Sequence, residues 1–217
     1  MKAHALLNTQ WRSRLATRDI REHLHDGSSD ELERYERRLA RVTIGTPPRL
    51  SGPIELSGYD TAWAQAYAHE AARIRDALRE RALRVEHVGS TSVPGLPSKP
   101  IIDIVLEVSD SSAETAYCPD LDAAGYVLRI REPDWFEHRL FEGQLGAVNL
   151  HVFSSLCPET ERMVRFRDWL RSNPADRDRY ANAKRELASR RWTYVQQYAD
   201  AKSAAIGSIM TRARGTR

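Results

Sequence analysis

Two hydrophobic periodicities divide the chain into helical and extended segments. After Asp60, which is placed to cap a helix, apolar residues recur every three or four positions and predict a helix. Its buried stripe is Trp63, Tyr67, Ile74 and Leu78. Alternation at every second position instead predicts strands, because successive side chains of a strand point to opposite faces. The predicted strands cover residues 84–88, 101–108, 126–130, 138–141 and 147–153. The glycine-containing segment 142–146 suits an antiparallel hairpin between the last two strands.

Helical spacing returns at 114–124, where Gly125 ends the segment, and again throughout the last third of the chain. Asn173 and Pro174 are placed as an N-cap and a first helical residue. A final helix is expected with the stripe Trp192, Val195, Ala199, Lys202, Ile206 and Ile209. This order of elements predicts an α/β (α+β) fold with a helical C-terminal tail.

The first 51 residues differ from the rest in carrying much charge and few large apolar side chains. Within them Leu32, Tyr35 and Leu39 have helical spacing, and Pro47 and Pro48 break the pattern. We therefore divide the chain into a charged, partly helical extension (1–51) and one compact domain (52–217). An arm packed on the domain is favoured for the extension over a recognition arm.

Composition is that of a globular protein, with 41% hydrophobic and 29% charged residues among 217. The longest apolar run, 101–108, is too short to cross a bilayer and contains two carboxylates. No secretory signal is apparent, so we expect a cytoplasmic protein without a membrane partner. Cys118 and Cys157 are isolated, which favours buried free thiols over a disulfide or a zinc site.

Charge is nearly balanced, with 33 basic and 30 acidic residues and a net charge of +3. Nucleic-acid binding is disfavoured because the arginines of the tail are spread among acidic residues. Those arginines are Arg162, Arg165, Arg167 and Arg171. A phosphorylated small-molecule substrate fits this charge balance equally well.

The candidate chemistry lies around the strand 101–108, whose polar face carries Asp103 and Glu107. A carboxylate in such an apolar strand is costly unless it meets a partner or a metal ion. Gly89 and Ser90 precede this strand, and glycine, hydroxyl and N–H groups can cradle phosphates while a carboxylate binds magnesium. A structural Asp103, paired with an arginine or capping a loop, is the alternative.

His151 is the further candidate for substrate contact or proton transfer, against a purely structural hydrogen-bonded histidine. Four basic residues are candidates for phosphate contact, each against an ordinary salt bridge or a snorkelling side chain. They are Lys99, Arg139, Lys184 and Lys202, of which Lys99 is selected for the phosphate site.

Three motifs closely resemble the signature of the GrpB family. They are EHVGSTSVPGL at 86–96 with KPIIDI at 99–104, NLHVF at 149–153, and RFRDWL at 165–170. The resemblance implies a nucleotidyltransferase-like fold, a short mixed sheet flanked by helices, within a superfamily that uses magnesium and a nucleoside triphosphate such as ATP. That superfamily places a second acid two residues after the first, where this chain has Val105.

Two interpretations of this departure stay open. Asp103 and Glu107 together bind one magnesium ion with substrate phosphates and water, or the site binds a ligand without the superfamily reaction. We therefore predict a magnesium-dependent nucleotidyltransferase-like enzyme acting on a small molecule; the alternative is a noncatalytic nucleotide- or ligand-binding module. The predicted catalytic residues are Asp103, His151 and Glu107, and the predicted phosphate-binding residues are Gly89, Ser90, Thr91 and Lys99.

Overall fold

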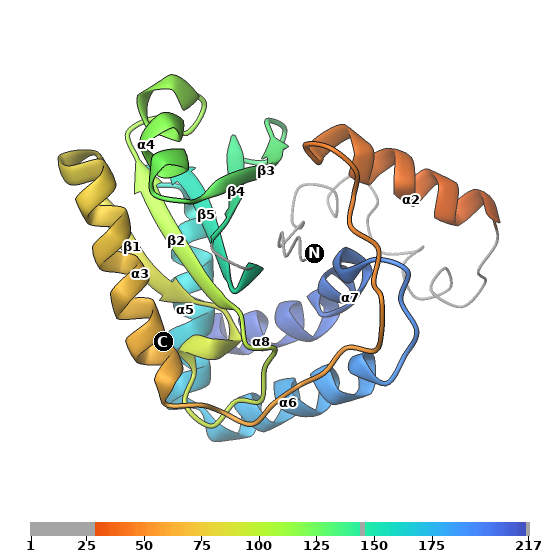
Figure 1. Ribbon diagram of the computed structural model, residues 1–217. Coiled ribbons are helices and arrows are strands. Elements are labelled where there is room, and N and C mark those ends of the chain that lie inside the picture. Colours follow the sequence, from red (N-terminus) through yellow and green to blue (C-terminus); the bar gives the residue numbers. More distant parts are fainter. Residues whose placement is uncertain (1–28, 144–145, 216–217) are drawn as a thin grey trace.

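A single five-stranded mixed sheet organises the computed structural model, which describes residues 29–143 and 146–215 (Figure 1). The strands are β1 (Arg84–Val88), β2 (Ile102–Val108), β3 (Val127–Glu132), β4 (His138–Glu142) and β5 (Val148–Ser154). Their order across the sheet is β1-β2-β5-β4-β3. β2 runs parallel to β5 and the other neighbouring pairs are antiparallel. The predicted mixed α/β fold is confirmed.

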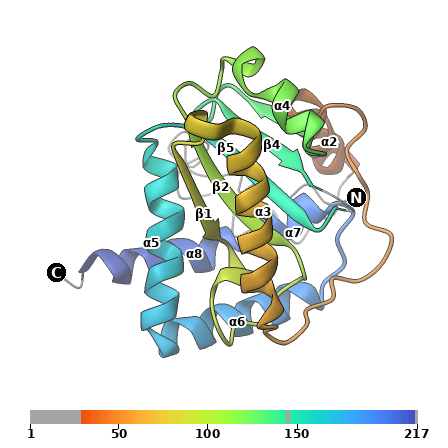
Figure 2. The ribbon, with the colours of Figure 1, turned by 60° about the vertical axis from the view of Figure 1, so that its left-hand side comes forward.

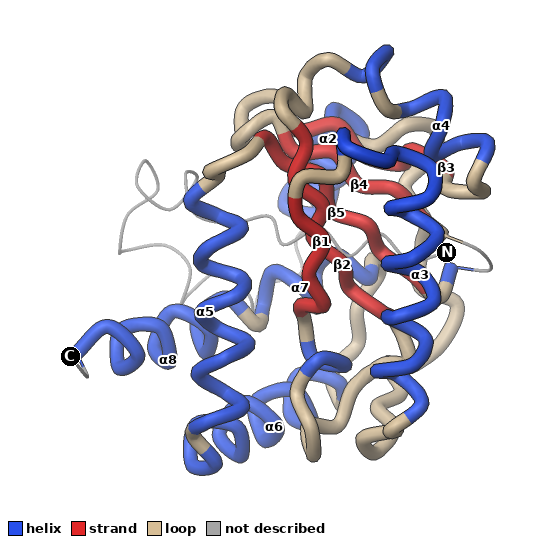
Figure 3. Tube along the Cα trace, turned by 90° about the vertical axis from the view of Figure 1, so that its left-hand side faces the viewer, coloured by secondary structure: helices blue, strands red, loops and turns tan. Residues whose placement is uncertain are grey.

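Helices cover both faces of the sheet, as Figures 2 and 3 show. On one face lie α3 (Ala62–Leu78) and α4 (Cys118–Ala123), packed on the side that carries Ile102, Ile104 and Leu106. On the other face α5 (Pro158–Ser172) packs Met163 against Val105 and Phe153. Next to α5 lie α6 (Pro174–Ala188) and α8 (Ser203–Gly215), and α7 (Val195–Ala201) contacts α6 and α8 (Figure 1). The alternation along β2 therefore separates two different helical layers.

The predicted strands and the β4–β5 hairpin are confirmed, with small shifts at the strand ends. The helix expected at 114–124 is shorter, because Pro119 lacks an N–H and fits only the first turn of a helix that begins at Cys118. The prediction of a single final helix was wrong, because the structure has two helices there, α7 and α8, which are separated at Lys202. An apolar stripe of helical spacing continues across that break, so periodicity did not show it.

The helix predicted in the extension is α2 (Ser29–Val42), which packs on the domain. The Tyr35 hydroxyl donates to the Asp200 carboxylate at 2.9 Å, and Arg38 reaches the same oxygen at 3.1 Å. Beyond the helix, Thr43 bridges to Ile130 of β3. In the part of the chain that the structure describes, no helix is long and apolar enough to span a membrane.

Candidate functional site

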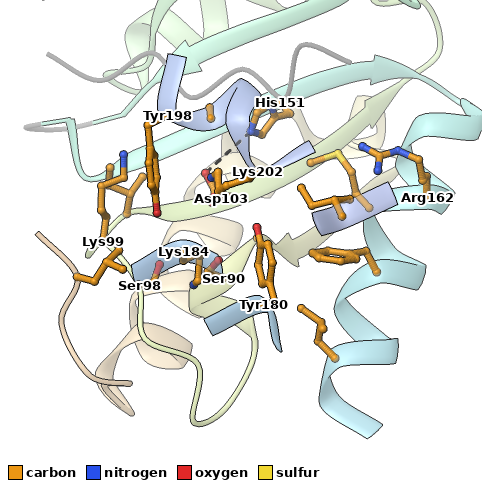
Figure 4. Close-up of a pocket in the computed structure, with 18 residues that line it drawn as sticks. Ser90, Ser98, Lys99, Asp103, His151, Arg162, Tyr180, Lys184, Tyr198 and Lys202 are labelled. Atoms are coloured by element: carbon orange, nitrogen blue, oxygen red, sulfur yellow. Dashed lines mark ion pairs between the residues drawn. The ribbon is translucent and has the colours of Figure 1, made fainter. Parts of the chain in front are cut away.

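One pocket lies between the α5-side face of the sheet and the C-terminal helices (Figure 4). Its floor includes Asp103 of β2 and His151 of β5, which sit on adjacent parallel strands. The turn after β1 contributes Gly89 and Ser90, and α5 contributes Arg162. The remaining polar lining comes from three lysines, Ser98, and two tyrosines, Tyr180 and Tyr198. Residues from Leu56 to Ile206 in the sequence thus contribute to one pocket.

Asp103 is held at the start of β2 by groups from neighbouring elements. The Asn149 side-chain amide donates to its Oδ1 at 2.8 Å, and Nε2 of His151 lies 4.0 Å from the same oxygen. Burial raises the pKa of this carboxyl, and the hydrogen bond from Asn149 and the nearby lysines oppose that rise. Its side chain stays 23% exposed, on the pocket side, so a ligand can reach it.

Gly89 is required because the backbone passes directly over Asp103. Its φ is +69°, in the region that favours glycine, and a Cβ placed there would lie 2.2 Å from Oδ2 of Asp103. Val88 and Asp103 are direct partners in the β1–β2 register. The Gly-Ser turn and the carboxylate therefore form one unit.

The hydroxyl groups of this turn have different roles. Ser90 lines the pocket, whereas Thr91 is buried and donates its hydroxyl to the Ile101 carbonyl at 3.1 Å. Ser92 donates to the Gly89 carbonyl at 2.6 Å. The structure thus brings Gly89, Ser90 and Lys99 of the predicted phosphate site to the pocket, while Thr91 braces the turn from behind.

Lysine is concentrated in the pocket to a degree that the sequence analysis missed. The chain has four lysines among its 33 basic residues, and Lys99, Lys184 and Lys202 all line the pocket. The Nζ atoms of Lys99 and Lys202 lie 5.2 and 4.9 Å from the ring centre of Tyr198. The scarcity of lysine elsewhere was the available signal for selecting Lys184 and Lys202 together with Lys99.

Lys184 is the most enclosed of these three, with 2% of its surface exposed and its ammonium group donating to the Pro97 carbonyl. Burial lowers the pKa values of Lys184 and Lys202, while Asp103 acts in the opposite direction on both. Arg162 also borders the pocket, but it is paired with the buried Glu159. The pocket therefore places three lysine side chains around one carboxylate, and a bound anion would favour the charged form of those lysines.

Glu107 is not brought to this pocket. It lies at the other end of β2, about 13 Å along the strand at the usual rise per residue. Its Oε1 is 4.0 Å from Arg84, and its side chain is buried. Between the two acids, Val105 is enclosed by Trp135, Phe153 and other apolar side chains. Asp103 and Glu107 are therefore on the same face of β2 but do not belong to one site.

The donor set does not fit a pair of magnesium ions held by the protein. Magnesium needs several oxygen ligands, and Asp103 is the single carboxylate among the described residues that line the pocket. No group of three or more His, Cys, Asp or Glu side chains within residues 29–143 and 146–215 could hold a metal ion. Three lysine side chains line the same pocket instead.

The candidate Arg139 and a further strand histidine, His87, do not line the pocket. Arg139 is paired with Glu114, the ordinary salt bridge that was its alternative. His87 stacks on Tyr67 with ring centres 4.7 Å apart, and its Nε2 lies 3.1 Å from Oγ1 of Thr91. Burial lowers the pKa of His87 to about 4, so it is a neutral structural histidine at pH 7.

The sequence is similar to a protein family and to proteins of several bacteria. Residues 53–212 match the family described as GrpB protein. The chain is 55% identical to a UPF0157 protein of Halalkalibacterium halodurans, over 87% of this chain and 97% of that one. It is 28% identical to a dephospho-CoA kinase of Mycolicibacterium paratuberculosis, over 68% of this chain and 42% of the kinase.

The fold is also similar to a solved structure. The crystal structure of the conserved protein GrpB from Enterococcus faecalis superposes with a TM-score of 0.63 at 29% sequence identity. The match covers 73% of this chain and 96% of that structure. Most of the compact domain therefore has a counterpart of the same architecture.

Proposed function

The chain belongs to the GrpB family, and from that membership and the lysine-lined pocket we propose that it binds a nucleoside triphosphate and transfers a phosphate-containing group to a small molecule. The observation that carries the proposal is the gathering of three of the four lysines around Asp103. A lysine ammonium group is a compact donor suited to phosphate oxygens.

The pocket residues divide into a binding set and a reacting pair. Lys99, Lys184 and Lys202 neutralise the phosphates, and the Ser90 hydroxyl and the open backbone at Gly89 hold them close to the sheet. Asp103 and His151 then face the acceptor group. Burial raises the pKa of Asp103 toward the range useful for accepting a proton from a hydroxyl or amine. Burial lowers the pKa of His151, so this ring is neutral and has a nitrogen lone pair that can accept a proton.

The resemblance to the nucleotidyltransferase superfamily implies that magnesium neutralises the charge of the triphosphate. In this proposal the three pocket lysines neutralise much of that charge instead. One ion at most enters with the triphosphate, because the pocket offers one carboxylate. Nucleotide binding is therefore expected to persist when magnesium is removed. A two-metal site would instead lose nearly all its affinity.

The test is ligand-induced stabilisation. ATP, pyrophosphate and dephospho-coenzyme A are each added with magnesium or with a chelator, and the melting temperature is measured. A ligand at 100 times its Kd raises the free energy of unfolding by about 2.7 kcal/mol. We expect stabilisation by ATP in both conditions, and its loss in Lys184→Gln and Lys202→Gln. Arg185→Gln is the matched control, because Arg185 is the exposed neighbour of Lys184 on α6.

Absence of any shift with all three ligands would remove the phosphate-binding proposal. Equal shifts in the natural protein and in both lysine variants would place binding elsewhere on the surface. Strict dependence on magnesium would restore the metal site implied by the resemblance and remove the charge role of the lysines.

A second candidate function is a noncatalytic nucleotide- or ligand-binding module. The observation in its favour is Val105, which occupies the position of the second acid and is packed in an apolar cluster. The two functions differ in turnover. An enzyme consumes ATP and releases pyrophosphate or ADP when the acceptor is supplied from a metabolite mixture, whereas a module binds ATP and returns it unchanged.

A further inference from the structure

A line of buried polar groups runs across the sheet and ends at the pocket. The Oε2 atom of Glu132, on β3, lies 2.7 Å from Nδ1 of His138 on β4. The Nε2 atom of His138 lies 3.1 Å from Nδ1 of His151 on β5. Nε2 of His151 in turn faces Oδ1 of Asp103 at 4.0 Å. We call Glu132, His138 and His151 the buried relay.

The surroundings of the relay hold its rings in place and keep its members neutral. Glu132, His138 and His151 are 3%, 0% and 1% exposed. The His138 ring stacks on His151 and on Phe153, with ring centres 5.2 and 4.7 Å away. Burial lowers the pKa of His138 to about 3 and that of His151 as well, and it raises the pKa of Glu132 to about 8.

Each neutral imidazole carries one proton, so the two contacts along the relay allow only two arrangements. When Glu132 is protonated it donates to Nδ1 of His138, His138 donates from Nε2 to Nδ1 of His151, and His151 presents an N–H to the pocket. When Glu132 is ionised every proton lies on the other nitrogen, and His151 presents a lone pair instead. The state of one distant carboxyl therefore sets the chemistry at Nε2 of His151.

We propose that Glu132, acting through His138, determines whether His151 is a hydrogen-bond donor or a base in the pocket. In the base form, His151 takes a proton from an acceptor hydroxyl at Nε2 and releases its Nδ1 proton to Nε2 of His138. His138 then releases its own Nδ1 proton to Glu132. One O–H bond breaks in the acceptor, one O–H bond forms on Glu132, and neither histidine is left charged. Glu132 and His138 are thus positioning residues for His151.

Charged groups around the relay act on its ends. Arg38 of α2 lowers the pKa of Glu132, and Glu132 in turn raises the pKa of Asp200 of α7. Arg139 lowers the pKa of His138, and Asp103, with Lys202 near it, faces His151. The second oxygen of Glu132, Oε1, is buried and makes no hydrogen bond to any described residue. Glu132 is therefore not locked in its ionised form by a donor.

The experiment is NMR of the full chain labelled with ¹⁵N at histidine, because the imidazole nitrogen shifts report which nitrogen carries the proton. Between pH 6 and pH 10 we expect His138 and His151 to change together from Nε2–H to Nδ1–H, with one midpoint near 8, the raised pKa of Glu132. In Glu132→Gln the amide replaces the protonated acid, and both rings should stay Nε2–H throughout. Glu70→Gln, which removes a buried carboxylate from the other face of the sheet, is the control and should titrate like the natural protein.

Fixed tautomers in the natural protein over this range, or an unchanged titration in Glu132→Gln, would overturn the proposal. Should Glu132→Gln fail to fold, His138→Phe interrupts the relay while keeping a ring against His151 and Phe153. His151 should then lose its change near pH 8, and its persistence would count against the relay. These measurements need no ligand, so they stand or fall separately from nucleotide binding.

A second measurement connects the relay to the pocket and rests on the proposed function. An N–H at Nε2 of His151 favours a phosphate oxygen, and a lone pair repels it. The ATP affinity of the natural protein should therefore fall roughly tenfold more between pH 7 and pH 9 than that of Glu132→Gln, the equivalent of about 1.4 kcal/mol. Equal decreases in the two proteins would show that the relay does not act on the ligand.

Discussion

At the scale of single residues, the site depends on a contact between backbone and side chain. Gly89 has no Cβ, and that missing atom leaves the space that Oδ2 of Asp103 occupies. The same absence allows the φ of +69° that turns the chain from β1 toward Ser90. Gly89 therefore allows the turn of the backbone and also leaves room for Asp103, the only carboxylate among the described residues of the pocket wall.

Gly89→Ala should destabilise the protein by about 2–5 kcal/mol, the sum of left-handed backbone strain and a steric overlap that Asp103 must relieve. Chemical denaturation measures the loss. Gly95→Ala is a close control, because Gly95 has a φ of +78° but its Cβ would meet nothing nearer than Arg177 at 4.0 Å. Similar losses in the two variants would mean that Asp103 moves aside freely, and the Gly89–Asp103 contact would not be a rigid unit.

At the scale of elements, one buried acid joins three of the helices that form the far wall of the pocket. Asp176, in the first turn of α6, accepts hydrogen bonds from Trp169 of α5 at 2.8 Å and from Arg212 of α8 at 2.9 Å. Arg179 adds a third pair at 2.9 Å. These bonds fix α5, α6 and α8 relative to one another, and hence the distance between Lys184 and the sheet.

Asp176→Asn should cost about 2–3 kcal/mol at pH 7, because it removes the buried negative charge that Arg212 and Arg179 contact. Arg212 and the other donors hold the pKa of Asp176 well below its usual range. Since the folded pKa is depressed, this stabilisation is present above the unfolded carboxyl pKa of about 4 and is lost as the pH falls below it.

Unfolding titrations at pH 7 and pH 3 check both statements about Asp176. The difference in free energy of unfolding between the natural protein and Asp176→Asn should be smaller at pH 3 than at pH 7. Asp178→Asn, an exposed acid on the same helix, should change stability by less than about 0.5 kcal/mol. A constant difference at both pH values would mean that hydrogen-bond geometry, not charge, provides the stabilisation.

At the scale of the whole molecule, the sheet carries three histidines that burial keeps neutral. They are His87 on β1, His138 on β4 and His151 on β5, and the pKa of each is lowered. In the unfolded chain each takes up a proton below a pH of about 6.5. Stability should therefore rise with pH through this window, because the unfolded state binds more protons there.

His87→Gln isolates one of these contributions without touching the pocket. Between pH 4 and pH 6.5, the free energy of unfolding of the variant should rise less steeply, by up to about 1.4 kcal/mol per pH unit, since one proton fewer is taken up on unfolding. His69→Gln, which replaces an exposed histidine on α3, is the control. Parallel curves for all three proteins would mean that His87 is protonated in the folded state.

Much of the fold and part of the site could be predicted from the sequence, because they depend on local pattern. Alternation identified the five strands, and the Asn173-Pro174 pair marked the start of α6. The GrpB motifs identified the family, which the comparisons confirm. Gly89, Ser90, Lys99, Asp103 and His151 were selected from their motifs, and the structure brings all five to one pocket.

The tertiary structure decided what depends on distance between elements. Periodicity reports which face of a strand a residue occupies, but not how far along that strand a site extends, so Glu107 shares a face with Asp103 and lies outside the pocket. Lys184 lies on α6 and Lys202 lies between α7 and α8, both more than 80 residues after Asp103. Only the packing of those helices brings the two lysines to Asp103. The buried relay likewise joins three strands in an order set by hydrogen bonding across the sheet. Such convergence is determined by the packing of distant segments, which leaves no local periodicity in the sequence.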